Sequence, residues 1–347
     1  KFDLNIYSPS KSTTSSPLPC NSTLCGPTRA CLTRSNTCAY QELYGTSSST
    51  GILVDDVLHL GTNTNPQDIV DVSVTFGCGK NQTGYFLESG GGINGIFGLG
   101  MGGISVPSIL ASKSVTANSF SMCFAESSGR IEFGDKGSAD QKTTPFNLQK
   151  SNPTYNITVT QVAVGNNVTD LEFTAVFDSG SAFTHLNEPT YSFIANNFIS
   201  QITETPYKFP YEVIFEYCYS LSATQDGYTT PNLTFTMKGE SQFYVTTPTF
   251  NFIRADGGQG YCLAIVKSEG INIIGREYSD HVSIKNFMTG YRLVFDRDEM
   301  VLGWKESDFV HPKRTPSPSL YGTDMPPHRR AASLLKKNPN STQLIAL

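Results

Sequence analysis

The sequence predicts a mainly β, loop-rich protein of the secretory pathway, and three observations support this. Apolar residues gather in short runs between Gly-, Pro-, Asn- and Ser-rich turn signals, which is typical of β-strands. Charged residues make up only 16% of the 347 residues, and Ser, Thr, Asn and Gly replace them. Four of the eight cysteines lie within residues 20–38, as in a small disulfide-stapled loop of an oxidising compartment.

Short runs rich in β-branched and aromatic residues are the expected strands. They are 52–54, 70–76, 130–133, 155–164, 173–177, 233–237 and 293–295. Two short helices are expected, at 106–111 after Ser105 and at 188–198 with Pro189 near its start. The strand–helix alternation of a doubly wound parallel sheet does not occur.

A weak internal repeat indicates two related lobes. Ile93-Asn-Gly-Ile-Phe-Gly-Leu-Gly100 and Ile271-Asn-Ile-Ile-Gly275 each place an apolar pair before a glycine. We expect a first lobe over residues 1–146 and a second over 147–308. Residues 309–347 contain six Lys or Arg and one acid, so this tail carries a charge of about +5 and the rest of the chain about −10, which together give the net charge of −5. A basic tail rich in Pro and Ser is expected to be disordered.

The composition also argues against several classes of binding partner. An acidic body argues against nucleic-acid binding, and no apolar run approaches the ~20 residues that span a bilayer. No C-x-x-C or paired His spacing occurs, so neither a metal nor another cofactor is expected. The Asn-x-Ser/Thr sequons indicate that the protein enters the secretory route, with the extracellular space, the cell wall or the vacuole as its destination. The candidate glycosylation sites are Asn21, Asn81, Asn156, Asn167 and Asn232.

The segment from Phe173 to Ser181 places Asp178 directly after an apolar strand. Gly180 permits backbone conformations that other residues avoid, and the hydroxyls of Ser179 and Ser181 can hydrogen-bond the carboxylate. An Asx turn that caps a strand would have the same composition. The buried strand before it and the run 182–186 after it favour a functional carboxylate.

A second motif is the Gly-, Ser- and Thr-rich turn that begins with Tyr44, Gly45 and Thr46. Strand-like runs on both sides predict a β-hairpin. It is either a plain surface hairpin or a mobile flap over a cleft, with Tyr44 reaching the substrate.

Jointly, these motifs resemble the pepsin-like aspartic proteases, in particular the plant nepenthesin-like branch, over roughly residues 1–308. The matching pieces are Tyr44-Gly-Thr46, Asn94 to Gly100, Ser105-Val-Pro-Ser108, Phe120-Ser-Met-Cys123, Asp178-Ser-Gly-Ser181, Asn272-Ile-Ile-Gly275, Asn286 to Asp296 and Leu302-Gly-Trp304. The resemblance implies a monomeric, bilobal β fold that cleaves peptides or proteins at acid pH. Each lobe supplies one aspartate, and the pair activates a water.

By the same resemblance, Asp178 is the catalytic aspartate of the second lobe. Ser181 is the hydroxyl beside it, Ser179 ties the two catalytic loops together, and Tyr44 is the flap tyrosine. The resemblance also implies three disulfides, Cys20–Cys38, Cys25–Cys31 and Cys218–Cys262. The counterparts of Cys78 and Cys123 pair with cysteines that this chain lacks, so these two are expected to be unpaired or mispaired with each other.

The chain departs from the family in two places. Before Tyr44 the only aspartate is Asp3, which no glycine follows, so the first Asp-Thr/Ser-Gly is absent. We therefore expect an N-terminally truncated chain with an incomplete first lobe and no activity by itself. Residues 276–285 form a polar insert where relatives are continuous. A splice variant or gene-model error would produce such an insert, and the alternative is a tolerated loop insertion.

Other features of the sequence are compatible with other functions. Residues 98–103 fit the pattern G-x-G-x-x-G of dinucleotide sites, but the strand–helix context is missing. The main alternative is a non-catalytic relative that binds proteins or carbohydrate. The Asp178 loop and the Tyr44 hairpin favour the enzyme, because a binding protein needs neither.

Overall fold

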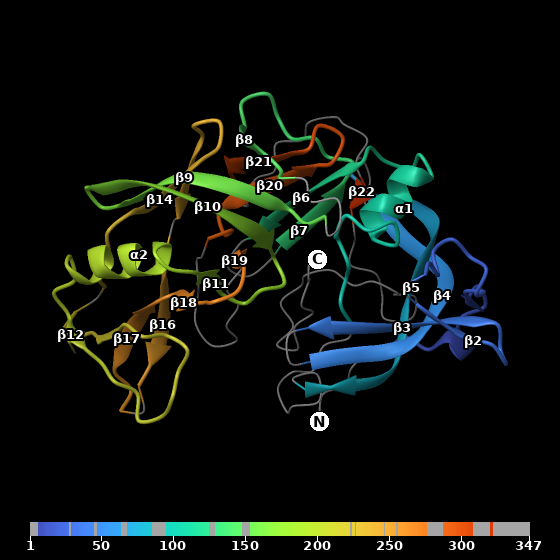
Figure 1. Cartoon of the computed structure of the whole chain (residues 1–347), viewed down its shortest axis with the longest axis horizontal. Coiled ribbons are helices and arrows are strands. Elements are labelled where there is room, and N and C mark those ends of the chain that lie inside the picture. The colour runs from blue at the N-terminus through green and yellow to red at the C-terminus, as the bar shows by residue number, and fades with distance from the viewer. Residues whose placement is uncertain are drawn as a thin grey trace. The chain divides into compact units, whose positions relative to one another are not determined.

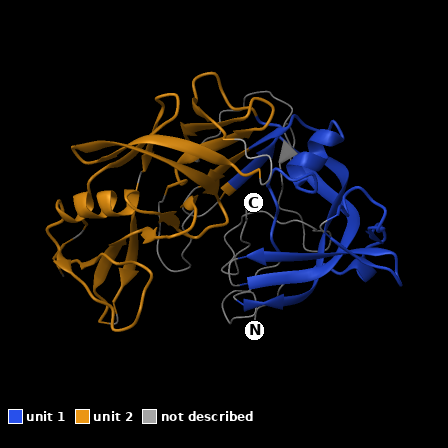
Figure 2. Ribbon diagram, in the orientation of Figure 1, with its two compact units in different colours: residues 1–120, 130–135, 315–344 blue, residues 121–129, 136–314, 345–347 orange. Residues whose placement is uncertain are grey.

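The computed structural model describes residues 6–27, 29–44, 47–63, 68–84, 95–124, 129–147, 153–222, 224–225, 227–245, 247–254, 256–275, 287–307 and 320–321. The chain divides into two compact units, coloured separately in Figure 2. Unit 1 comprises residues 1–120, 130–135 and 315–344, and unit 2 comprises residues 121–129, 136–314 and 345–347. Strands predominate in both units, which confirms the mainly β prediction.

Unit 1 is organised around one long strand. Its elements are the 3-10 helix η1 (Pro9–Lys11), the helix α1 (Val106–Ser112) and the strands β1 (Ser16–Pro17), β2 (Ala30–Leu32), β3 (Thr37–Tyr44), β4 (Ser47–Thr62), β5 (Ile69–Thr83), β7 (Gly129–Phe133) and β22 (Leu320–Tyr321). All pairings of β4 are antiparallel, with β5 along most of its length and with β3, β1 and β22 in turn. Strand β6 (Ser119–Phe124) begins in unit 1 and ends in unit 2, and the first residue of β7, Gly129, also belongs to unit 2.

From Val54 to Leu60 the burial of β4 alternates from one residue to the next, as expected of a strand with one face against a core. Val54, Leu58 and Leu60 are buried, and so is Asp56, which is 6% exposed. A buried carboxylate requires hydrogen-bond donors. Asp56 accepts hydrogen bonds from the hydroxyls of Tyr7 (2.6 Å) and Thr14 (2.5 Å) and from its neighbour's backbone N–H. These hydrogen bonds hold the segment that contains Tyr7 and Thr14 against strand β4.

Burial acts to raise the pKa of Asp56, but the hydrogen bonds from Thr14, Tyr7 and the backbone outweigh it, so that its pKa lies below the ordinary value of 3.8. The folded state therefore holds this carboxylate ionised more strongly than the unfolded chain does. The stability it contributes is present above the ordinary pKa and is lost as the pH falls through the lowered folded pKa.

We expect Asp56→Asn to loosen residues 6–15 at pH 6 by roughly 1–3 kcal/mol, because a charged acceptor is lost. Hydrogen exchange of this segment measures the effect, and the difference from the wild type should shrink as the pH falls below 3.8. Asp68→Asn is the control, since Asp68 is exposed. Equal loosening by both variants would contradict the role given to Asp56.

Unit 2 contains the remaining elements (Figure 1). They are β8 (Lys142–Pro145), β9 (Asn156–Val164), β10 (Asn167–Asp178), β11 (Thr184–Leu186), α2 (Thr190–Ile199), β12 (Thr205–Pro206), β13 (Cys218–Ser220), β14 (Leu233–Met237), β15 (Gln242–Val245), β16 (Thr249–Ile253), β17 (Gln259–Leu263), β18 (Ile265–Lys267), β19 (Asn272–Gly275), β20 (Tyr291–Asp296) and β21 (Val301–Glu306). Seven of the strands form one sheet in the order β15-β14-β9-β10-β19-β11-β18, and four form another in the order β12-β13-β17-β16.

Aromatic side chains fill the core of unit 2. Phe243 contacts Phe177, Tyr291 and Trp304, with ring centroids 5.5, 4.8 and 5.8 Å apart. Trp304 is 1% exposed and donates its indole N–H to the carbonyl of Gln242 at 3.1 Å. Trp304 is the single tryptophan of the chain, so its fluorescence reports on unit 2.

All seven predicted strands and both predicted helices are present, but three strands are longer than predicted. Strand β4 covers residues 47–62 where 52–54 were predicted, β5 ends at residue 83 where 76 was predicted, and β10 begins at residue 167 where 173 was predicted. The predicted domain limits at residues 146 and 308 stay predictions. Of the predicted tail, the structure describes the two residues of β22, which pair with β4 and β7. The insert 276–285 lies outside the described residues.

Candidate functional site

Strand β10 positions the candidate catalytic carboxylate. It lies between β9, which is antiparallel to it, and β19, which is parallel to it. Its last four residues, from Ala175 to Asp178, are all buried, as in a central strand that is covered on both faces. Asp178 is the last residue of β10 and is 8% exposed.

The turn after Asp178 holds both oxygens of its carboxylate. The backbone N–H of Gly180 donates to Oδ1 and the hydroxyl of Ser181 donates to Oδ2, each at 2.8 Å. The backbone N–H of Ser181 also lies 3.3 Å from the carbonyl of Asp178, which closes the turn. The bond from Ser181 is one that the sequence pattern allows, whereas the bond from the Gly180 N–H was not predicted. Together the two bonds fix the direction of the carboxylate.

A second strand end supports this turn. Gly275, the last residue of β19, is the register partner of Asp178. Its N–H donates to the hydroxyl of Thr184 at 3.2 Å, and Thr184 is 1% exposed. The sequence reasoning did not single out Thr184. Thr184 lies in the run 182–186 that follows the Asp178 turn, and this position is the one hint that the sequence offers. Its hydrogen bond with Gly275, 91 positions away, is visible only in the folded structure.

Ser179 differs from its neighbours. Its side chain is 6% exposed, and its hydroxyl has no hydrogen-bond partner among the described residues. Leaving a buried hydroxyl without a hydrogen-bond partner destabilises a protein by about 1–3 kcal/mol. Such a group in a native structure therefore calls for an explanation, for example a partner that is not present. The resemblance assigns Ser179 to the contact between two catalytic loops, and this assignment stays a prediction.

The predicted hairpin around residue 44 is present. Strands β3 and β4 pair from Ala39–Ile52 to Tyr44–Ser47, so residues 47–51, which were expected in the turn, belong to strand β4. Gly45 and Thr46 lie outside the described residues. Burial, with a smaller contribution from the charge of Glu42, raises the pKa of Tyr44 to about 12. The phenol of Tyr44 therefore stays neutral and can donate a hydrogen bond at any pH at which a protease would act.

Two family models match the chain, described as xylanase inhibitor N-terminal over residues 2–135 and xylanase inhibitor C-terminal over residues 154–306. Aspartyl protease family protein 1 of Arabidopsis thaliana is 50% identical over 311 residues, which are 88% of this chain and 58% of that protein. Aspartic proteinase-like protein 1 of the same plant is 38% identical over 340 residues, 94% of this chain and 62% of that protein. Nepenthesin-1 of Nepenthes gracilis, an aspartic proteinase, is 27% identical over 290 residues, 78% of this chain and 63% of that protein.

The chain belongs to the pepsin-like aspartic protease family. It spans about three fifths of the length of these curated relatives. Among solved structures, conglutin gamma, a basic 7S globulin from lupine seeds, superposes with a TM-score of 0.67 at 21% identity, over 87% of this chain and 83% of that one. This likeness confirms the predicted fold.

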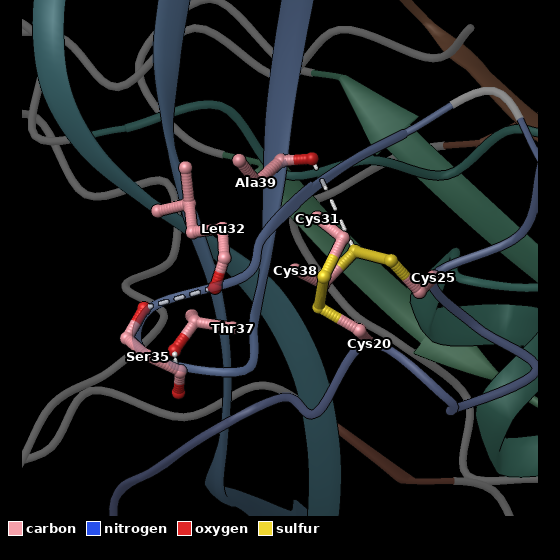
Figure 3. Close-up of a disulfide and its surroundings, with 8 residues drawn as sticks. All are labelled: Cys20, Cys25, Cys31, Leu32, Ser35, Thr37, Cys38 and Ala39. Carbon is pink, nitrogen blue, oxygen red and sulfur yellow. Dashed lines mark hydrogen bonds between the residues drawn. A yellow bond between two sulfur atoms is a disulfide. The ribbon is translucent and has the colours of Figure 1, made fainter.

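The family resemblance was wrong about two disulfide pairings. The structure pairs Cys20 with Cys31 and Cys25 with Cys38, where the nested pairs Cys20–Cys38 and Cys25–Cys31 were expected (Figure 3). Strands β2 and β3 place Cys31 directly opposite Cys38, on one face of a hairpin. Cys25 and Cys38 are both buried beside Leu18, while Cys20 and Cys31 both lie nearer the surface. Their spacing alone could not decide between the two arrangements.

This correction can be checked by mapping the disulfides. Trypsin cleaves after Arg29 and Arg34 and chymotrypsin after Leu24, so the four cysteines of residues 20–38 fall into separate peptides. We expect Cys20 to be linked to Cys31 in the unreduced digest. A peptide that links Cys20 to Cys38 would contradict the structure.

The predictions for the other four cysteines agree with the structure. Cys218 and Cys262 form the third disulfide. Cys78 and Cys123 are buried and belong to no disulfide, so they are not bonded to each other. We expect these two thiols to resist alkylation in the native protein and to react after denaturation, because both are shielded from reagent.

The candidate glycosylation sites differ in exposure. Asn21, Asn81, Asn167 and Asn232 are exposed. Asn156 is half-buried, and its Oδ1 accepts a hydrogen bond from the amide of Asn147 at 2.8 Å. Asn156 is therefore the least accessible of the five, and glycosylation at all five stays a prediction.

Two further findings concern the described residues. They contain no group of three or more His, Cys, Asp or Glu side chains that could hold a metal ion. Neither α1 nor α2 has the length and apolar character that a bilayer-spanning helix requires.

Proposed function

We propose that this chain is part of a secreted acid endopeptidase, in which Asp178 supplies one of two catalytic carboxylates. The observation that carries the proposal is the geometry at the end of β10. A buried carboxylate is held there by Gly180 and Ser181, one donor to each oxygen. The curated relatives named aspartic proteinases support the reaction class.

The proposed reaction is hydrolysis of a peptide bond by an activated water. Two carboxylates that lie close together cannot both ionise easily, so one remains protonated as the acid while the other acts as the base. This division of roles is established for aspartic proteases in general. Fixed donors on both oxygens of Asp178 would hold its carboxylate in position without reorganisation during the reaction. The neutral phenol of Tyr44 would donate a hydrogen bond to substrate from the flap.

The chain by itself would not perform this reaction, because its sequence contains no second Asp-Thr/Ser-Gly. The buried hydroxyl of Ser179 supports the same view, since a partner loop would satisfy it. The proposed activity therefore belongs to a protein that also contains a first catalytic loop. Its substrates are peptides or proteins in the extracellular space, the cell wall or the vacuole.

The test compares the chain alone with the chain extended at its N-terminus by the corresponding segment of Aspartyl protease family protein 1. We expect no cleavage of an unfolded protein substrate at about pH 4 by the chain alone, and pepstatin-sensitive cleavage by the extended protein. Asp178→Asn should abolish that cleavage, whereas Asp170→Asn, at an exposed position on the same strand, should not. Cleavage by the chain alone, or by the extended Asp178→Asn variant, would refute the proposal.

A second candidate is a non-catalytic binding protein. It is favoured by the family models, which are described as xylanase inhibitor domains, and by the absence of the first aspartate. A binding protein should inhibit a xylanase equally well with Asp178 or with Asn at that position. Inhibition by the chain alone, with an inactive extended protein, would support this candidate over the protease.

A further inference from the structure

A polar pocket of about 460 Å³ lies in unit 2, between the residues after α2 and the loop before β14. None of the residues of the Asp178 turn lines it. Its lining includes amide, hydroxyl, carboxylate and aromatic side chains, among them Gln201, Thr203, Glu204, Gln225, Tyr228 and Thr229. Its volume lies within the range of small-molecule sites, roughly 300–1,000 Å³.

Glu204 is the charged group of the pocket, and its position is fixed. Its Oε1 accepts a hydrogen bond from the amide of Gln225 and its Oε2 one from the hydroxyl of Tyr261, both at 3.0 Å. Burial acts to raise the pKa of Glu204, but hydrogen bonds from the backbone, Gln225 and Tyr261 together hold it below the ordinary value. These donors hold the carboxylate of Glu204 in a fixed position and favour its ionised form.

Tyr228 gives the pocket a rigid aromatic surface. Its ring stacks on that of the buried Tyr261, with centroids 3.8 Å apart and an angle of 8° between the planes. Its hydroxyl lies 2.9 Å from that of Thr249 and donates to the side chain of Asn251. Both the ring and the hydroxyl are therefore held in place before any ligand binds, which lowers the entropic cost of binding.

The chemistry of the lining narrows the ligand. As the structure describes it, the lining contains no Lys, Arg or His to attract an anion and too few apolar groups for a hydrophobic ligand. A single carboxylate that already accepts hydrogen bonds from Gln225, Tyr261 and the backbone is a poor metal site. Neutral ligands with several hydroxyl or acetamido groups fit best, because amides, hydroxyls and a carboxylate can donate to and accept from them. We propose that this pocket binds a saccharide.

The saccharide could come from two sources. One is a free oligosaccharide, and the other is a glycan of this protein itself. Asn232 is exposed, begins the sequon Asn-Leu-Thr and directly follows Pro231, which lines the pocket. The core sugars of an Asn232-linked glycan would therefore start at the edge of the pocket.

The test uses the full chain secreted from a eukaryotic host, as wild type and as Asn232→Gln. Saturation-transfer NMR would measure binding of N,N′-diacetylchitobiose, the core disaccharide of N-glycans, and of cellotetraose. Binding of either sugar by both proteins would indicate a site for free saccharides. Binding by Asn232→Gln alone would show that the protein's own glycan fills the pocket. Binding of neither sugar to either protein would overturn the proposal.

Variants then locate the binding. Glu204→Gln and Tyr228→Ala should each weaken binding roughly tenfold. The first variant removes the negative charge of the pocket, and the second removes its aromatic ring. Thr229→Arg tests the pocket without touching the Tyr261 stack, since Thr229 is exposed, and should abolish binding. Tyr211→Ala, an aromatic residue that is 66% exposed and outside the lining, is the control. Unchanged binding by folded Thr229→Arg would place the sugar elsewhere and refute the site.

Discussion

Replacing Gly275 by alanine is expected to destabilise unit 2 by about 3 kcal/mol, near the upper end of typical overpacking effects. A Cβ at this position would lie 2.6 Å from the carbonyl carbon of Phe183, still closer to its oxygen, and 2.8 Å from the carbonyl oxygen of Ser181. All of these are backbone atoms, which cannot move aside as a flexible side chain can. Either β19 must shift along β10 or the turn after Asp178 must open.

Both responses would disturb the candidate site, because Gly275 is the register partner of Asp178. The fluorescence of Trp304 during urea unfolding measures the stability of unit 2. Gly270→Ala is the matched control, since a Cβ there would have Ser268 as its nearest neighbour, at an ordinary 3.7 Å. Equal stability of the two variants would show that the strand end tolerates a side chain and that the close approach does not hold the turn.

The sequence predicted the local parts of this site well. The apolar run before Asp178 is the end of strand β10, and the hydroxyl of Ser181 donates to the carboxylate as expected, although that of Ser179 does not. These features depend on residues within a few positions of one another, where strand periodicity and turn chemistry decide the conformation.

Contacts between distant segments could not be predicted in the same way. Gly275 and Thr184 are 91 positions apart, and Glu204 and Tyr261 are 57 apart. The cysteines of residues 20–38 show the same limit at short range, because their pairing depends on which two side chains the hairpin buries. The family resemblance predicted the fold correctly, but it predicted the pairing of these four cysteines wrongly.

Loss of the disulfide Cys218–Cys262 is the second large effect we expect. The two residues are 44 positions apart and lie directly opposite each other in β13 and β17. A cross-link over this separation restricts the unfolded chain by about 4 kcal/mol in the chain-entropy description. Both cysteines also pack in a cluster with Phe215 and Phe252, so alanine at both positions would remove buried contacts as well.

The Cys20/Cys31 pair provides the comparison, because replacing it with two alanines opens a loop with a separation of only 11 residues. That variant should lose about 3 kcal/mol or less, and the loss should occur in unit 1. In urea unfolding followed at Trp304, the Cys218→Ala/Cys262→Ala protein should therefore unfold at a clearly lower urea concentration, while the Cys20→Ala/Cys31→Ala protein should resemble the wild type. A shift of the same size in both proteins would mean that the two units unfold together. No shift in the first would mean that the β13–β17 pairing and its aromatic cluster hold this sheet without the cross-link.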